Sequence, residues 1–350
     1  MLKHCFLGAN TPEGFRSEYR TLQTDPRIRR LRILKGGPGC GKSTLMRKVA
    51  EAGERLGLRA LRVACSSDPD SLDAVVLPEI GLAVADGTAP HVLEPEVCGC
   101  DANYVNLGAC YRRTPQPADA ATIAAEKAAN RSCYGPAYAC LAGCGAVQRA
   151  IACLTAPVEA AATKEALRQL EEERLPQGDE DGSALRCYLS GVTPKGLMQW
   201  ETGCGTVWAI RDSFRLGAPL LRRLAAAYRK AGYRTVLAMD PFAPDQPSGL
   251  LIPTLDRAYL REDPILRTEQ RAMKVLNLDA AAEAGLPAAQ RERIEALNAL
   301  RQQLAEEAVG WLARAKAHHD ALEQLCRPLV DFGAVDEETQ RMIDTLLTEA

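Results

Sequence analysis

The amino-acid sequence predicts an α/β fold, built from two tandem domains with parallel sheets and added helices. The chain has 350 residues, enough for about two domains. In its first half, short apolar runs that suit buried strands alternate with stretches of helical periodicity. Sequence matches to this first half then recur in the second half. We therefore expect a first domain at residues 1–175, a linker at 176–184 and a second domain at 185–350.

The composition narrows the class of protein. Apolar residues make up 47% of the chain and charged residues 25%, which is typical of a globular protein. The net charge of −2 lacks the basic excess of nucleic-acid and membrane-surface binders, so we expect neither partner. The sequence has no run of about 18 apolar residues, and its first residues have too short an apolar core for a secretory signal. We expect a cytoplasmic protein whose 13 cysteines are free thiols.

Strand and helix patterns follow one another regularly in the first half. A buried strand is predicted at 31–35, a helix follows from Lys42, and a second strand covers 59–65. Residues 66–73 have the composition of a turn-rich loop, and 74–86 of strand material broken at Pro78. Long helices are predicted at 119–175 and at 288–326, the latter amphipathic. This order predicts a parallel sheet with helices on both faces.

An internal repeat links the two halves. The segment HCFLGANTPEGF at 4–15 is echoed by RCYLSGVTPKGL at 186–197, offset by 182 positions, and further matches follow at offsets of 176 and then 175. Collinear matches with two small gaps indicate a duplicated domain. The repeated Thr-Pro-x-Gly element, which begins at Thr11 and Thr193, has the composition of a helix start, with threonine as N-cap and proline in the first turn.

A glycine-rich segment follows the first predicted strand and opens the first helix. It fits the pattern G-x-x-x-x-G-K-[ST] of the phosphate-binding P-loop, or Walker A motif. Glycines let consecutive backbone N–H groups point at phosphate oxygens, and the positive end of the helix adds to this attraction. Lys42 would reach the β- and γ-phosphates, and the Ser43 hydroxyl would bind Mg²⁺. The predicted nucleotide-binding residues are Gly36, Gly37, Pro38, Gly39, Cys40, Gly41, Lys42, Ser43 and Thr44.

A P-loop protein also needs an acid at the end of a neighbouring strand to hold the Mg²⁺ shell. Asp86, which ends the run GLAVAD, is the first candidate, with an ordinary turn aspartate as the alternative interpretation. Glu79, after the run AVVLP, is the second candidate. His91 is a candidate sensor of the γ-phosphate, or else a solvated loop residue.

Other polar residues are harder to assign. One of three aspartates after the second strand would orient water or a substrate hydroxyl: Asp68, Asp70 or Asp73. Three arginines are equally possible arginine fingers: Arg112, Arg113 and Arg131. Three residues near one face of the long C-terminal helix are expected to lie on the surface: His318, His319 and Glu323.

The second copy lacks the groups that bind phosphate. Residues 212–219 align with the P-loop, and there Ala218 replaces the lysine and Pro219 replaces the serine. Bulky Phe214 and Leu216 occupy the loop, and Arg261 falls where Asp86 would be. Such a loop cannot cradle a triphosphate in the usual way. We expect a degenerate second copy and a single nucleotide site in the first half.

The chain resembles a family of two-domain bacterial proteins, common in Firmicutes, that are described as ATP-binding or P-loop NTPases. The resemblance rests on FLGANTPEGF, GGPGCGKSTLMRKVAE, DPDSLDAVVLPEIGLAVADGTAPH and the TPKG element near residue 193, and it covers most of the chain. It implies tandem P-loop NTPase-type domains and a bound nucleotide, but no particular substrate. Both halves can carry a P-loop in that family, and this sequence departs from the pattern at 212–219.

The leading functional hypothesis is Mg²⁺-dependent binding and hydrolysis of a nucleoside triphosphate. Lys42, Asp86 and His91 would be catalytic, and Ser43 and Asp86 would hold the metal. ATP is favoured over GTP because the chain has no N-K-x-D motif near the site. One alternative is a kinase that passes the γ-phosphoryl group to a small molecule, with the helices of 119–175 as a lid. The other is a nucleotide-gated switch with negligible turnover, whose helix at 288–326 docks a protein partner.

Overall fold

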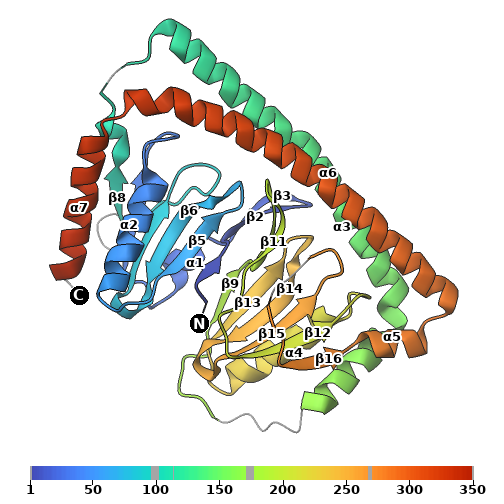
Figure 1. The fold of residues 1–350 in the computed structure, drawn as a ribbon. Helices are drawn as coiled ribbons and strands as arrows, with labels where there is room; N and C mark the ends of the chain where they lie inside the picture. The colour runs from blue at the N-terminus through green and yellow to red at the C-terminus, as the bar shows by residue number, and fades with distance from the viewer. Residues whose placement is uncertain (1, 96–101, 113, 171–176, 267–269, 349–350) are drawn as a thin grey trace. The chain divides into compact units, whose positions relative to one another are not determined.

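The chain folds into two compact units in the computed structural model, which describes residues 2–95, 102–112, 114–170, 177–266 and 270–348 (Figure 1). One unit consists of Ser17–Pro136 and Gly310–Ala350, and we call it the P-loop unit. The other consists of Met1–Arg16 and Ala137–Val309, and we call it the companion unit. These units group residues by contact. The division into sequence copies around 176–184 remains a prediction, and residues 177–183 have neither helix nor strand.

The P-loop unit contains a mixed β-sheet. Its strands run in the order β5-β6-β7-β4-β8, with β4 parallel to both β7 and β8 and with β6 antiparallel to both β5 and β7. The elements of this unit are α1 (Thr21–Thr24), β4 (Arg30–Lys35), α2 (Lys42–Arg55), β5 (Leu61–Cys65), β6 (Asp68–Leu77), η1 (Pro78–Ile80), β7 (Leu82–Asp86), β8 (Ala102–Asn106), η2 (Leu107–Cys110), η4 (Arg327–Leu329) and α7 (Phe332–Thr348).

The prediction of a parallel sheet is therefore wrong in part, because β6 runs against its neighbours. Residues 68–73, expected to form a loop, belong to β6. The chain then turns through η1 and Gly81, whose φ of 64° is left-handed, and enters β7 at once. So short a connection can join only antiparallel neighbours, since a parallel pair needs a long crossover.

Apolar side chains of α2 pack against one face of this sheet, together with α7. Leu45, Met46 and Val49 of α2 are fully buried. The apolar residues of α2 recur at helical spacing, so one stripe of the helix faces the sheet. In Figure 1, α7 lies beside α2 at the edge of the unit. This packing fixes the start of α2, where the P-loop ends.

The companion unit contains a sheet of the same strand order. Its strands run β16-β12-β15-β14-β13-β9, so that β12 takes the place of β4 between two parallel neighbours. Even the irregular pairing recurs, since register shifts flank Ala64 in β5 and Met239 in β13. The elements of this sheet and its helices are β9 (Ala184–Cys187), β12 (Thr206–Arg211), α4 (Gly217–Lys230), β13 (Thr235–Asp240), β14 (Ala243–Ile252), η3 (Pro253–Leu255), β15 (Arg257–Glu262), β16 (Lys274–Asn277) and α5 (Asp279–Gly285).

The two Thr-Pro-x-Gly elements form tight hairpins, so the prediction that they start helices is wrong. One joins β2 (Gly8–Thr11) to β3 (Gly14–Ser17), and the other joins β10 (Ser190–Thr193) to β11 (Gly196–Gln199). In the first, the Thr11 hydroxyl donates to the Gly14 carbonyl at 2.7 Å, and Gly14 has a φ of 98°. Thr193 and Gly196 repeat both features. The short strand β1 (His4–Cys5) precedes the first hairpin.

Two long helices, α3 (Pro117–Leu170) and α6 (Ala288–Cys326), lie side by side along most of their length (Figure 1). In the P-loop unit the Asn130 amide donates to the Ala315 carbonyl at 2.7 Å, and in the companion unit the Cys144 thiol donates to the Arg301 carbonyl. The helix predicted at 288–326 is confirmed. Helix α3 ends at Leu170, and 171–176 lie outside the described residues.

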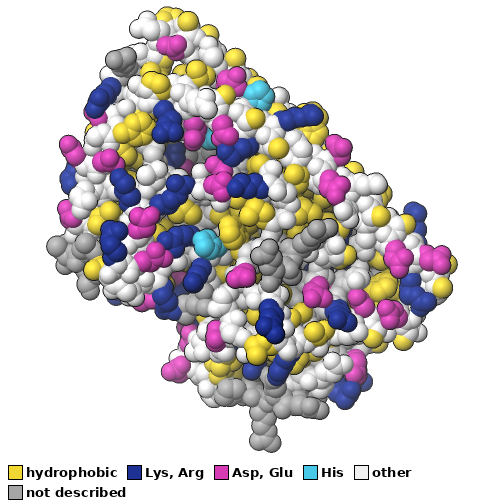
Figure 2. Space-filling model, in the orientation of Figure 1, with side chains coloured by type: hydrophobic (Ala, Val, Ile, Leu, Met, Phe, Trp, Pro, Cys, Tyr) yellow, Lys and Arg dark blue, Asp and Glu magenta, His cyan; other side chains and the backbone are white. Residues whose placement is uncertain are grey.

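Helix α3 is also long and apolar enough to cross a membrane, by length and composition alone. Its most apolar window has a mean hydropathy of 1.4 despite the alternation of alanine with polar residues. Several of its side chains instead belong to the core of the companion unit, among them Ile151, Val158 and Ala162. About two fifths (39%) of that apolar window is buried within the structure. Figure 2 shows basic and acidic side chains interspersed on the visible face, which agrees with the small net charge.

Candidate functional site

The glycine-rich loop lies between β4 and α2, as the motif requires. Strand β4 ends at Lys35 and α2 begins at Lys42. Gly39 and Gly41 have φ angles of 68° and 90°, in the left-handed region that glycine adopts without strain. Gly41 is the N-cap of α2, so the first N–H groups of the helix have no partner within it. The loop therefore has the backbone geometry of an anion-binding nest at a helix N-terminus.

Lys42 curls back over this loop. Its ammonium group donates to the carbonyl oxygens of Gly36 at 2.8 Å and Gly37 at 3.0 Å. The same nitrogen lies 3.6 Å from Oδ2 of Asp86, and both side chains are largely buried. The lysine charge is thus held at the mouth of the nest, beside a carboxylate.

Asp86 ends β7 at the edge of the sheet where the P-loop begins. It pairs with Leu34 of β4 in the parallel register, so it lies beside the end of the P-loop strand. Its Oδ1 accepts hydrogen bonds from the backbone N–H and the hydroxyl of Thr88, at 2.8 and 2.6 Å. These bonds orient the carboxylate so that Oδ2 is the oxygen beside Lys42. Open α/β sheets bind ligands at this carboxyl edge of their parallel strands.

Glu79, the other candidate for the magnesium shell, lies away from the loop. It belongs to η1, which precedes β7 and so lies at the opposite edge of the sheet. There its carboxylate bonds the guanidinium and the backbone N–H of Arg59. Burial is the largest single influence and would raise the pKa of Glu79, but the hydrogen bonds and the charge of Arg59, with a backbone hydrogen bond, together lower it. Of the two candidates, the structure brings only Asp86 to Lys42.

Ser43 has its hydroxyl oxygen turned toward β6. This oxygen accepts hydrogen bonds from the N–H of Leu72 at 2.9 Å and from Arg47 at 3.1 Å. Ser43 and Asp86 supply only oxygen atoms, the ligand type that Mg²⁺ prefers, and Mg²⁺ commonly takes one or two protein oxygens together with phosphates and water. The donor set therefore fits Mg²⁺, on condition that Arg47 releases the Ser43 oxygen. Thr44, the last residue of the motif, is exposed.

A buried polar cluster surrounds Asp73 next to Asp86. Ala74 of β6 pairs with Ala85 of β7 at the end of their antiparallel ladder, and Asp73 and Asp86 follow directly beyond that pair, close enough for the charge of Asp86 to act on Asp73. The hydroxyl of Tyr19 donates to Oδ2 of Asp73 at 2.8 Å, and Nε2 of His91 lies 3.5 Å from the same oxygen. Burial is the main cause that raises the pKa of Asp73, and the charge of Asp86 adds to it, whereas His91 and Tyr19 oppose it.

His91 is therefore a buried residue, so its interpretation as a solvated loop residue is wrong. Its ring also packs on Tyr19, with ring centroids 4.7 Å apart. The sequence reasoning missed Tyr19, which precedes the P-loop strand and carries no motif of its own. Among the three candidate aspartates, the structure brings Asp73 to Asp86, whereas Asp68 pairs with Lys316 at 3.4 Å and Asp70 is exposed.

None of the arginine-finger candidates is brought to the loop by a contact among the described residues. Arg112 pairs with Asp331. Arg131 is exposed on α3, and Arg113 lies outside the described residues. His318 pairs with Glu126 of α3 at 2.8 Å. Glu323 keeps 41% of its side-chain surface exposed, as expected of a surface residue, and it also lies against the P-loop at Gly39.

The corresponding loop of the companion unit is filled by its own side chain. The Asp212 carboxylate accepts hydrogen bonds from the N–H groups of Leu216 and Gly217, the latter at 3.0 Å. Arg261 adds a further bond to Asp212, from Nε at 2.5 Å. These N–H groups are the ones that would face a phosphate in a working loop. A carboxylate of the loop itself thus takes the place of the ligand.

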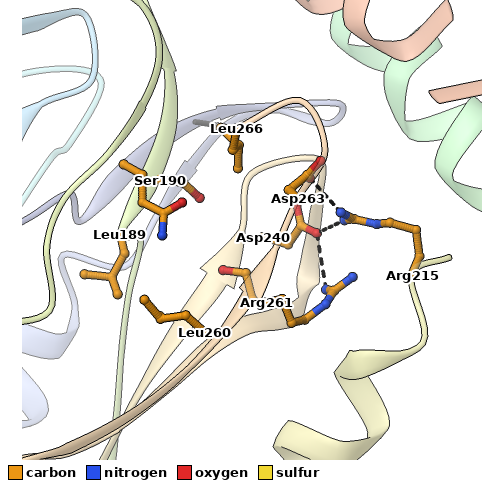
Figure 3. Close-up of a pocket in the computed structure, with 10 residues that line it drawn as sticks. Leu189, Ser190, Arg215, Asp240, Leu260, Arg261, Asp263 and Leu266 are labelled. Carbon is orange, nitrogen blue, oxygen red and sulfur yellow. Dashed lines mark hydrogen bonds and ion pairs between the residues drawn. The ribbon is translucent and has the colours of Figure 1, made fainter. Parts of the chain in front are cut away.

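Further buried charges close the same region (Figure 3). Arg215 pairs with Asp240 and with Asp263, the latter at 2.6 Å, and Arg301 of α6 pairs with Asp263 at 2.6 Å. Burial would lower the pKa of Arg215, but the charges of Asp240 and Asp263 outweigh it and raise the pKa. The small hollow beside this network is lined by Ser248, Arg261 and Leu266, which stand 175 positions after Asp73, Asp86 and His91.

Comparison of the chain with protein-family models, with curated proteins and with solved structures finds no match in any of the three. The function must therefore be inferred from the residues and their geometry.

Proposed function

We propose that the P-loop unit binds a nucleoside triphosphate, ATP in preference to GTP, and hydrolyses it with Mg²⁺. The observation that carries this proposal is the position of Lys42, whose ammonium lies at the mouth of a glycine-rich nest and 3.6 Å from the Asp86 carboxylate. A nest of N–H groups, a lysine and a strand-end acid are the parts that P-loop enzymes use to hold and polarise phosphates. The resemblance to ATP-binding P-loop NTPases supports the same function.

Each residue has a distinct task in this proposal. The N–H groups of residues 37–41 would bind the phosphate oxygens, and Lys42 would leave its two carbonyl partners to neutralise charge on the β- and γ-phosphates. Ser43 and Asp86 would hold Mg²⁺, which supplies charge neutralisation of the phosphates when bound. Asp73 lies beside Asp86 and would accept a hydrogen bond from the attacking water, with Tyr19 and His91 fixing its orientation. His91 would then respond to the γ-phosphate through Asp73.

We also propose that the companion unit is a degenerate copy of the same fold. The shared strand order, the repeated register shifts and the two hairpins support a duplication. Its loop has lost the lysine, the serine and the strand-end acid together, and buried ion pairs fill the region. The companion unit would therefore bind no nucleotide.

The test is nucleotide binding by the wild-type protein and by K42A. Isothermal titration with ATP and Mg²⁺ should give saturable binding to wild type, and K42A should weaken it by at least about 100-fold, since charged hydrogen bonds to phosphate are lost. Lys48→Ala is the matched control, because Lys48 lies on the same helix and pairs with Asp336. Binding to K42A within about threefold of wild type, roughly 0.7 kcal/mol, would refute the assignment.

Phosphoryl transfer to a small molecule is a second candidate function. It is favoured by Asp73, since a buried carboxylate held by Tyr19 and His91 suits an acceptor hydroxyl as well as water. The two functions differ in a simple measurement. A hydrolase releases inorganic phosphate from ATP in buffer alone, whereas a kinase turns over rapidly only when an acceptor is added.

A further inference from the structure

A carboxylate from the far end of the chain lies at the P-loop. The Glu323 carboxylate, in the last turn of α6, lies close enough to the loop for the backbone N–H of Gly39 to contribute to lowering its pKa. Gly39 occupies the middle of the glycine-rich loop, where N–H groups would otherwise face phosphate oxygens. Glu323 thus lies beside a donor that the proposed nucleotide needs.

The backbone of α6 makes the same approach. A Cβ atom on Gly39 would lie 3.0 Å from the carbonyl oxygen of Glu323 and 3.2 Å from Cγ of Arg327. Helix α6 ends at Cys326, so this carbonyl is one of the last four, which have no partner within the helix and carry its partial negative charge. The end of α6, which carries Glu323, therefore packs directly on the loop at Gly39.

Other contacts hold this helix end in place. Tyr111 covers the neighbouring residue, since a Cβ atom on Gly37 would collide with the Tyr111 hydroxyl. His319 lies 3.5 Å from the Glu323 carboxylate, and its hydrogen bond is the main cause that lowers the pKa of Glu323. Glu323 is therefore an anion at neutral pH. Its side chain keeps 41% of its surface exposed, so it has room to leave.

In the companion unit, a carboxylate accepts hydrogen bonds from the N–H groups of the loop, but this carboxylate cannot be displaced. There the Asp212 carboxylate occupies the N–H groups of its own loop and is fully buried against Arg261. Asp212 cannot leave, because it is part of the loop and its departure would strand a buried arginine. Glu323 comes from a separate helix and has no buried arginine as a partner among the described residues. Glu323 therefore corresponds to Asp212, except that it can leave the loop.

We propose that Glu323 is an internal competitor for phosphate, and that nucleotide binding expels it and the end of α6 from the P-loop. This inference rests on the proposed function of the site. The inference adds a displaceable side chain, Glu323, to that site. The affinity for a phosphate-bearing ligand is set in part by the displacement of Glu323, and a partner that holds the end of α6 away would tighten nucleotide binding.

The first test compares the wild-type protein with E323Q, using inorganic pyrophosphate and MgATP as separate probes in isothermal titration. Glutamine keeps the size of the side chain and removes its charge. We expect E323Q to bind both probes about tenfold more tightly, by the same factor, because both gain the same nest. Glu337→Gln is the matched control, since Glu337 is an exposed residue of α7, and it should leave both affinities unchanged.

Equal or weaker binding of pyrophosphate by E323Q would overturn the inference. If wild type still bound MgATP and K42A did not, the proposed function would survive that result. If neither wild type nor E323Q bound either probe, both this inference and the proposed function would be refuted.

A second measurement needs no variant. Hydrogen exchange of the backbone amides at 319–327 in the wild-type protein should become faster when saturating MgATP is added, because the helix end loses its contacts. Slower exchange of this segment with MgATP would show that α6 closes on the nucleotide, which contradicts the proposal.

Discussion

Asp73 and Asp86 stand next to Ala74 and Ala85, the last pair of the antiparallel β6–β7 ladder, and both carboxylates are buried where the P-loop begins. Like charges close together on neighbouring strands destabilise a sheet. Lys42 offsets the charge of Asp86, and Tyr19 and His91 surround Asp73. Such costly arrangements concentrate at functional sites, where stability is reduced for the sake of chemistry.

Replacement of Asp73 by Asn should therefore raise stability and lower turnover. The neutral amide removes a buried charge, so the melting temperature should rise, while ATP hydrolysis should fall by about 100-fold because the attacking water loses its acceptor. ATP affinity should stay within about threefold of wild type. Asp70→Asn changes the same charge on an exposed residue of β6 and is the control. A fall in both stability and affinity would mean that Asp73 is a structural residue.

Asp86→Asn should reduce Mg²⁺-dependent turnover by about 10- to 100-fold, the usual cost of losing a group that holds a metal. Binding of ATP without Mg²⁺ should be unchanged or tighter, because Lys42 is released from its partner. Steady-state hydrolysis across a Mg²⁺ titration measures the first effect, and titration in EDTA the second. Glu79→Gln should change neither. If E79Q lost Mg²⁺ dependence and D86N kept it, the roles of the two acids would be reversed.

Each chain should bind one nucleotide. The P-loop offers its N–H groups and Lys42, whereas the companion loop has Asp212 in its nest and Ala218 and Pro219 in place of lysine and serine. Titration should give a stoichiometry near one in wild type and no binding in K42A. The double variant A218K/P219S should also stay near one, since Asp212 still occupies the loop. A stoichiometry near two in wild type would contradict the degenerate reading of the second copy.

Asp263→Asn should destabilise the companion unit without affecting the nucleotide site. Removing one member of a buried ion-pair network typically costs about 3–5 kcal/mol, because its partners stay charged and buried. Here the partners left behind are Arg215 and Arg301. Denaturant unfolding should report the loss, and MgATP affinity should remain that of wild type. Unchanged stability would show that the network contributes little.

The same aspartate gives the stability a pH dependence of known sign. Burial would raise the pKa of Asp263, but Arg215 and Arg301 outweigh it and lower the pKa below its usual range. A carboxyl group with a depressed folded pKa contributes stability above its unfolded pKa, about 4, and loses that contribution as the pH falls toward the folded pKa. The destabilisation by D263N should therefore be full at pH 6–7 and shrink below about pH 4. A difference that grew in acid would contradict this account.

The loop and its supporting strand and helix could be predicted from sequence because the signal is local. Glycines at fixed spacing, Lys42 and Ser43 specify the P-loop by themselves. Asp86 was also within reach, since it ends an apolar run. In contrast, residues 68–73 were expected to form a loop, because Asp, Pro and Ser favour turns. Pairing with β5 and β7 overrides that preference, and the antiparallel direction of β6 follows from this tertiary contact.

The rest of the site depends on residues distant in sequence. Tyr19 reaches Asp73 over 54 positions, and Glu323 reaches Gly39 from the last turn of α6. No spacing rule connects such pairs, so the sequence alone could place Glu323 only on a helix surface. The internal repeat did contain one signal that pointed to these residues. The residues 175 positions after Asp73, Asp86 and His91 are Ser248, Arg261 and Leu266, so all three differ together between the repeats.

Under the proposed duplication, the companion loop keeps one feature of the P-loop, since Arg215 has the left-handed φ of 63° close to the 68° of Gly39. A non-glycine residue in this conformation is strained by about 1 kcal/mol, and a reversion to glycine would relieve the backbone. It would also abandon Asp240 and Asp263, whose charges Arg215 neutralises in the interior. Restoring the lysine or the serine alone would meet a nest already filled by Asp212. If the companion loop descends from a phosphate-binding loop, as proposed, none of these single substitutions alone would restore phosphate binding.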